Sequence, residues 1–119
     1  MILCSGKVYF DLIEAREKLK RNDVIFYRIE QLYPFPVKSL VKELKPYAKN
    51  AKFYWCQEEP KNMGAWFSAR DYIQWTLDNI KANNNQISYI GRSPDASPAT
   101  GYAKWHVSQQ KEIIKKVFE

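Results

Sequence analysis

Hydrophobic and polar residues along the chain form blocks that fit strands and helices in turn. The apolar segment "ILC" comes first, and after Gly6 the residues Val8, Leu12, Ala15 and Leu19 recur at spacings of three or four. This spacing gives a helix one apolar face, whereas a short apolar run is typical of a buried strand. The chain therefore opens with a predicted strand and a helix that ends at the polar "KRND".

Three further strand and helix pairs follow the first. "VIFYRIE" at 24–30 is β-branched and aromatic, which favours a strand covered on both faces, and "KFYWC" at 52–56 and "ISYIG" at 87–91 are the next predicted strands. Pro36 can open the second helix at its first turn. The apolar faces expected for the last three helices are Leu40, Val41, Leu44 and Tyr47, then Trp66, Ala69, Ile73, Leu77 and Ile80, then Ile113, Ile114, Val117 and Phe118.

The order of these elements predicts the fold class. Strand and helix alternate four times, and each helix is long enough for a right-handed crossover between parallel strands. The sequence therefore predicts one α/β domain over residues 1–119, a three-layer α/β/α sandwich around a mostly parallel sheet of four strands.

Composition and charge narrow the class of protein. Hydrophobic residues make up 45% of the chain and aromatic residues 15%, which excludes a disordered chain. There is no apolar run near the roughly 20 residues that cross a bilayer, and no signal-peptide layout, so we expect a soluble intracellular protein. The net charge is +6, but basic and acidic residues are mixed, as in "EAREKLKR". Solvated helix faces are the preferred interpretation, and a free-standing protein that binds nucleic acid is the alternative.

Motifs for nucleotide, metal or nucleophilic chemistry are missing from the sequence. The single glycine of "CSGK" makes neither a dinucleotide-binding nor a Walker loop. Cys4 and Cys56 fall in separate predicted strands and His106 is the only histidine, so we expect buried free thiols and no structural zinc. His106 also has no recognisable nucleophile beside it.

The stretch "WCQEEPKNMGAW", residues 55–66, contains two adjacent carboxylates and raises the question of a catalytic acid pair. Glu58 and Glu59 are neighbours in an extended segment, so their side chains should point to opposite faces and not share a proton. A structural corner is the preferred interpretation, in which one of the two carboxylates accepts amides or an arginine at a buried junction.

The residues after the two glutamates suit such a corner. Pro60 should end the strand, Asn62 can cap the next helix, Gly64 admits a close approach of backbone, and Trp66 would anchor the corner.

Five motifs in this order resemble the C-terminal domain of the decarboxylase component of 2-oxoglutarate dehydrogenase: "ILCSGKVYFDL", "RIEQLYPFP", "WCQEEPKNMGAW", "YIGR" and "ASPATGYAKWH". The resemblance covers nearly the whole chain. It implies the C-terminal fold of the transketolases, with about five strands, the fifth lying before Met1 or at an edge. It also implies that the chain is a fragment of a much longer polypeptide, with Met1 supplied as a start.

The resemblance further implies an activity for the complete polypeptide, an oxidoreductase of the citric acid cycle. Members bind thiamine diphosphate and Mg²⁺, decarboxylate 2-oxoglutarate and pass the succinyl group to a lipoyl arm of the acyltransferase component. The preceding domains make the cofactor contacts, so we expect no cofactor, metal or catalytic residue in this chain. Its partners would be those domains, a second subunit of a homodimer and the acyltransferase, in the cytoplasm or the mitochondrial matrix.

Two sets of residues are candidate sites. The first is a junction with the remaining domains, in which aromatic side chains at strand tips are expected to be exposed and to join the corner residues: Tyr33, Phe35, Glu58, Glu59, Asn62, Gly64, Trp66, Tyr102 and Trp105. The second is a regulatory nucleotide or anion site built from donors on one loop: Arg92, Ser93, Ser97, Thr100 and Lys104. A plain Ser/Pro-rich loop is the alternative to the second set.

Overall fold

A computed structural model of the chain describes residues 1–94 and 103–119, with only the backbone described over 103–106. Within this part, four strands form one parallel sheet in the order β2-β1-β3-β4. The elements in chain order are β1 (Ile2–Cys4), α1 (Val8–Leu19), β2 (Phe26–Arg28), α2 (Val37–Leu44), the 3-10 turn η1 (Lys45–Tyr47), β3 (Tyr54–Pro60), α3 (Trp66–Asn79), β4 (Ser88–Arg92) and α4 (Ala103–Val117). No helix in the described ranges is long and apolar enough to cross a membrane.

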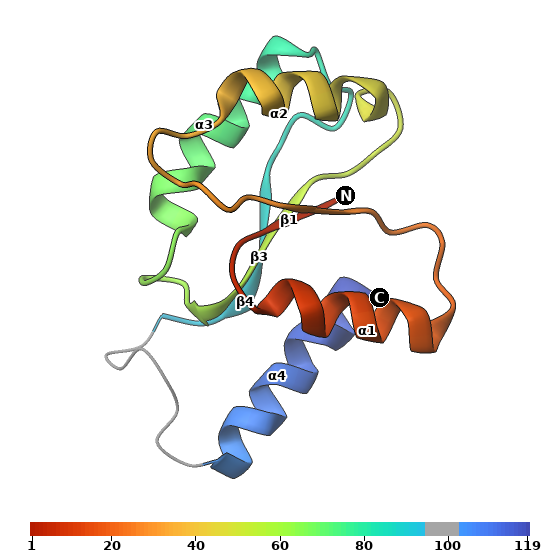
Figure 1. Cartoon of the computed structure of the whole chain (residues 1–119), viewed down its shortest axis with the longest axis vertical. Helices are drawn as coiled ribbons and strands as arrows, with labels where there is room; N and C mark the ends of the chain where they lie inside the picture. The colour runs from red at the N-terminus through yellow and green to blue at the C-terminus, as the bar shows by residue number, and fades with distance from the viewer. Residues whose placement is uncertain (95–102) are drawn as a thin grey trace.

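Helices cover both faces of the sheet, which gives the predicted three layers. Helices α2 and α3 lie on one side of the strands, and α1 and α4 lie on the other (Figure 1). The side chains of β1 show how one strand serves both layers, because alternate residues of a strand point to opposite faces. Leu3 packs into the α2 and α3 layer, whereas Ile2 and Cys4 pack into the α1 and α4 layer. The predicted α/β/α sandwich is therefore confirmed.

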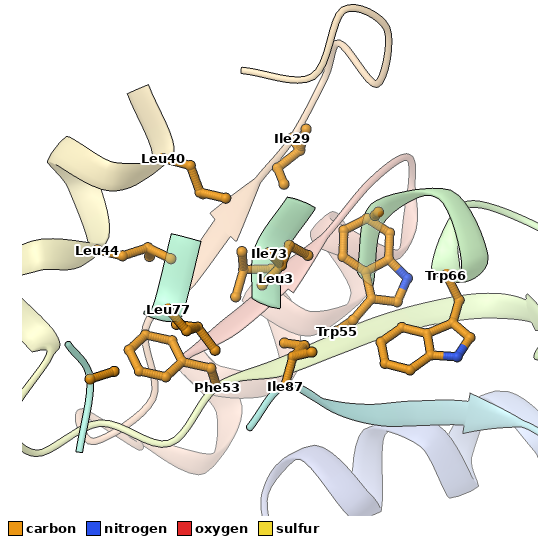
Figure 2. Packing of buried hydrophobic residues seen from close by; sticks show 12 residues of the cluster. Leu3, Ile29, Leu40, Leu44, Phe53, Trp55, Trp66, Ile73, Leu77 and Ile87 are labelled. Carbon is orange, nitrogen blue, oxygen red and sulfur yellow. The ribbon is translucent and has the colours of Figure 1, made fainter. Parts of the chain in front are cut away.

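The larger of the two cores lies under α2 and α3. Figure 2 shows Trp55 and Trp66 beside each other at one end of this cluster, with Leu44 and Leu77 toward the other. The buried members of the cluster are Leu3, Ile29, Leu40, Leu44, Phe53, Trp55, Trp66, Ala69, Ile73, Leu77, Ala82 and Ile87. Two tryptophans at the same end of the core mark the region where the chain turns from β3 into α3.

Some expected boundaries and apolar positions differ from the structure. Strand β3 continues to Pro60 instead of ending at residue 56, because the "QEEP" stretch pairs with β4 through an irregular register between Cys56 and Pro60. Leu19 was expected on the apolar face of α1 but is 54% exposed. The buried residues of that helix are Val8 and Leu12. Tyr47 is also exposed, because it falls in the 3-10 turn after α2 and leaves the apolar face of that helix.

The strand order creates a switch point between β1 and β3. Helix α1 leads from β1 to its neighbour on one side, β2, whereas α2 leads from β2 across β1 to β3. The loops that follow β1 and β3, residues 5–7 and 61–65, therefore leave the sheet toward opposite faces. In open α/β sheets this arrangement opens a crevice at the carboxyl ends of the strands, where ligands and partners bind. The fifth strand that the resemblance implies is not among the described residues.

Candidate functional site

Gln57 organises the turn from β3 into α3, residues 57–66, which we call the strand-tip corner. Its side chain is buried, at 2% exposed. The amide Nε2 donates to the carbonyl oxygens of Pro60 at 3.0 Å and Met63 at 2.8 Å. The amide oxygen accepts from Trp55 Nε1 at 2.9 Å and from the backbone N–H of Trp66 at 3.0 Å. One side chain thus joins the strand, the turn and the start of the helix.

The start of α3 differs from the expectation that Asn62 caps it. The helix begins at Trp66, and the residue at its cap position, Ala65, makes no side-chain capping bond. Asn62 lies four residues before the helix, too early to receive the N–H groups of its first turn. Gln57 takes this part instead, since its amide oxygen accepts the N–H of Trp66.

Gly64 allows the corner to close on itself. Its φ is +66°, and a Cβ built on it would lie 2.8 Å from Glu59 Oε2 and 3.1 Å from Gln57 Oε1. Gly91 on β4 serves the same region, because a Cβ there would lie 2.8 Å from the carbonyl oxygen of Gln57 and would also collide with the Tyr89 hydroxyl. Both positions require a residue without a side chain.

The two glutamates face different layers. Glu58 Oε2 lies 3.3 Å from Lys7 Nζ and 3.4 Å from Gln110 Nε2, so this carboxylate meets α1 and α4. Glu59 lies beside Gly64 on the side of α3. The two carboxylates therefore do not form an acid pair, and no arginine side chain in the described residues pairs with either of them.

A small pocket lies at the switch point between the loop after β1 and the start of α3. Its volume is about 250 Å³, below the roughly 300–1,000 Å³ typical of small-molecule sites. We call it the switch-point pocket, and it is lined by Ser5, Gly6, Leu32, Trp55, Gln57, Glu59, Gly64, Ala65 and Ser68. Among the described residues, the lining contains one carboxylate and two serine hydroxyls without a histidine or lysine base, so these residues form no activated nucleophile.

The thiols of Cys4 and Cys56 are neighbours across β1 and β3, where their Cα positions are paired in register. Both are buried, and burial raises the pKa of each to about 12. Neutral buried thiols are poor nucleophiles and poor metal ligands. Burial also raises the pKa of the Tyr89 hydroxyl to about 12, so this group stays protonated at neutral pH.

The aromatic residues expected at an exposed junction behave differently from one another. Tyr33, which precedes a cis peptide bond to Pro34, is 91% exposed. Phe35 is half-buried and stacks on Tyr72, with ring centroids 4.9 Å apart. Trp66 is only 7% exposed, so the expectation of an exposed side chain is wrong.

Trp66 is covered because it sits on the apolar face of α3, in the larger core. Its ring lies against that of Tyr89, with centroids 5.3 Å apart. Tyr102 lies outside the described residues, and so does the side chain of Trp105.

The residues of the candidate anion site are only partly described. Arg92 Nε donates to the carbonyl oxygen of Glu58 at 2.5 Å, and Arg92 Nη1 donates to Gln109 Oε1 at 2.9 Å. The guanidinium thus joins β4 to β3 and α4. Ser93 is exposed and lines a pocket of about 230 Å³ beside Arg92. Ser97 and Thr100 lie outside the described residues, as does the side chain of Lys104, so this site stays a prediction.

Sequence reasoning missed Gln57, although its position carried a signal. It follows Trp55 by two residues and therefore shares the buried face of β3, where a polar side chain needs a hydrogen-bond partner. The identity of those partners depends on the fold of residues 60–66, which periodicity does not reveal.

The switch-point pocket is a poor fit for thiamine diphosphate and Mg²⁺. Magnesium in such sites is held by carboxylate and other oxygen ligands together with phosphate oxygens. Among the side chains that the structure describes, those of residues 1–94 and 107–119, no group of three or more His, Cys, Asp or Glu could hold a metal ion. The switch-point pocket offers one carboxylate in about 250 Å³.

Two comparisons with known proteins, one against family models and one against curated proteins, agree on one family. A family model described as 2-oxoglutarate dehydrogenase C-terminal matches residues 1–118. The 2-oxoglutarate dehydrogenase E1 components of Brucella anthropi and Brucella ovis are each 51% identical to this chain over 115 residues, which are 97% of this chain and 11% of each relative. The chain thus spans about a tenth of the length of the curated relatives it matches. It belongs to the 2-oxoglutarate dehydrogenase C-terminal family.

Proposed function

We propose that this chain is the C-terminal domain of a 2-oxoglutarate dehydrogenase E1 polypeptide and that it supports the assembly of that enzyme without taking part in its chemistry. The observation that carries the proposal is that the side-chain amide of Gln57 is fully hydrogen-bonded within this chain. Its two amide hydrogens and two oxygen lone pairs are all engaged by groups of this chain. This buried amide at the switch point therefore fixes the shape of the strand-tip corner and has no capacity left for a substrate.

The proposed activity of the complete polypeptide is the oxidative decarboxylation of 2-oxoglutarate, with transfer of the succinyl group to a lipoyl arm. Thiamine diphosphate and Mg²⁺ would bind to other domains of that polypeptide. Its partners would be a second identical subunit and the acyltransferase component, in the cytoplasm or the mitochondrial matrix. This assignment is supported by the family match over residues 1–118 and by the names of the relatives.

The surface that we propose for the junction with the other domains lies around the switch point. Tyr33, next in sequence to the pocket residue Leu32, has an almost fully exposed ring, and Phe35 adds an aromatic surface through its stack on Tyr72. Aromatic residues are enriched in protein interfaces because they bury a large area at a small cost in conformational entropy. Trp66 supports this surface from inside the core.

The test compares three proteins in one assay of 2-oxoglutarate turnover, with thiamine diphosphate and Mg²⁺ present. These are the native-length polypeptide, the same polypeptide without residues 1–119, and the 119-residue chain alone. We expect turnover by the first protein only, together with a lower dimer content of the second by sedimentation. Turnover by the isolated chain, or full activity and normal assembly without it, would contradict the proposal.

A further inference from the structure

The switch-point pocket holds a carboxylate whose countercharge is not found in the described part of the chain. Glu59 makes no side-chain hydrogen bond or ion pair there, whereas its neighbour Glu58 is held by Lys7 and Gln110. Residues 95–102, "DASPATGY", contain no lysine or arginine, and Lys104 is the one lysine or arginine whose side chain the structure does not describe. A half-buried carboxylate is stabilised by a cation or by hydrogen-bond donors. Glu59 therefore needs such a partner from outside the described residues.

The size and walls of the pocket limit what can bind to Glu59. At about 250 Å³ the pocket is smaller than a typical cofactor site, but it can receive one side chain. Leu32 and Trp55 provide an apolar wall, and Gly6 borders open space, since a Cβ there would meet nothing within 4 Å. The Gln57 amide is fully engaged, so Glu59 is the charged acceptor that remains for an incoming donor.

These features favour a guanidinium over an ammonium group. A planar guanidinium can donate two parallel hydrogen bonds to one carboxylate and can stack on an aromatic ring. Tyr33, next in sequence to Leu32 at the pocket, offers such a ring with 91% of its surface exposed. The apolar wall and the single carboxylate of the pocket match the stem and the head of an arginine side chain, and the exposed Tyr33 ring follows the lining residue Leu32 in sequence.

We propose that Glu59 receives an arginine side chain from a segment of the same polypeptide outside residues 1–119, and that Tyr33 covers it. The chain spans 11% of the length of its relatives, so most of such a polypeptide lies outside the structure and can supply this segment. The inference rests on the proposed function and deepens it, because it assigns one residue pair to the junction between this domain and the rest of the enzyme.

The test is photo-crosslinking in the native-length polypeptide with p-benzoylphenylalanine in place of Tyr33. We expect mass spectrometry to find the photoreactive residue at position 33 joined to a peptide that lies outside residues 1–119 and contains an arginine. Glu59→Gln should lower the yield of this product about tenfold, because it removes the charge and keeps the shape. The matched control, Glu58→Gln, changes a carboxylate on the opposite face and should leave the yield unchanged.

A charge exchange provides a second measurement that a purely structural role of Glu59 would not reproduce. Glu59→Arg should abolish the cross-link, and changing the identified arginine to glutamate in the same polypeptide should restore it. This rescue keeps the proposal testable even where a single substitution weakens folding.

The possible results separate this inference from the proposed function. A product with an outside peptide that lacks arginine, or one whose yield responds equally to Glu59→Gln and Glu58→Gln, would overturn the pairing and leave the junction in place. A product formed only within residues 1–119, for example with Lys104, would overturn both the pairing and the proposed junction at the switch point.

Discussion

Replacing Gln57 with methionine should destabilise the domain strongly, because the substitution keeps an unbranched side chain of similar length and removes every hydrogen bond of the amide. Trp55 Nε1 and the backbone N–H of Trp66 would both lose their acceptor in a buried site, where the bonds are 2.9 and 3.0 Å long. An unsatisfied buried donor costs about 1–3 kcal/mol, so the pair costs about 2–6 kcal/mol. The carbonyls of Pro60 and Met63 lose their donor as well.

The assay is urea unfolding of the 119-residue chain, monitored by tryptophan fluorescence and circular dichroism. At a slope of about 2 kcal/mol per molar urea, even the lower cost moves the midpoint down by about 1 M. Gln86→Met is the matched control, because Gln86 is exposed and a surface change of this kind stays within about 0.5 kcal/mol. Equal midpoints for Gln57→Met and Gln86→Met would refute the claim that the hydrogen bonds of the Gln57 amide stabilise the domain.

Three further predictions follow from glycine geometry and thiol burial. Gly64→Ala should cost more than Gly6→Ala in the same urea titration: both have positive φ, which costs about 1 kcal/mol, but only at Gly64 would a Cβ crowd the buried Gln57 amide, whose Oε1 would lie 3.1 Å away. Cys4 and Cys56 should react with a thiol reagent at pH 8 only after unfolding, because burial raises each pKa to about 12; rapid labelling of the folded chain would contradict this. The free energy of unfolding should fall as the pH rises from about 9 to about 12, since unfolded thiols lose protons near pH 9 and folded thiols near pH 12; a Cys→Ala double variant with the same pH slope would refute it.

Helical periodicity predicted the layers of this fold from the sequence. The spacing of Val8 and Leu12 located α1, and the spacing of Ala69, Ile73 and Leu77 located α3, because an apolar stripe on a helix has a single stable position against a sheet. The order of the strands in the sheet was not predicted. The strand order depends on which face of the sheet each crossover helix covers, and the local sequence pattern does not specify that face.

Trp66 shows where two sequence arguments conflicted. As the first residue of the apolar face of α3 it was expected to be buried, and as an aromatic residue at a strand tip it was expected to be exposed. Burial prevailed, since the side chain packs beside Trp55 in the larger core (Figure 2). A position on a helix face predicts the environment of a large apolar side chain better than proximity to a loop does.

The strand-tip corner could be located from the sequence, but the hydrogen bonds that hold it could not be predicted. Pro60 and Gly64 indicated a turn, because one lacks an N–H and the other adopts positive φ. Asn62 was expected to cap the helix on the basis of residue type alone. Gln57 performs that task from nine residues before Trp66, a distance that local capping rules do not cover.

The central claim is that this domain belongs to a long E1 polypeptide, and the mass of the native protein tests it most directly. An antibody raised against the 119 residues would be used to detect that protein in its source cells by immunoblot after denaturing electrophoresis. Because 115 residues are 11% of each relative, we expect a band about nine times heavier than 14.1 kDa. A band near 14.1 kDa with no heavier species would contradict the account.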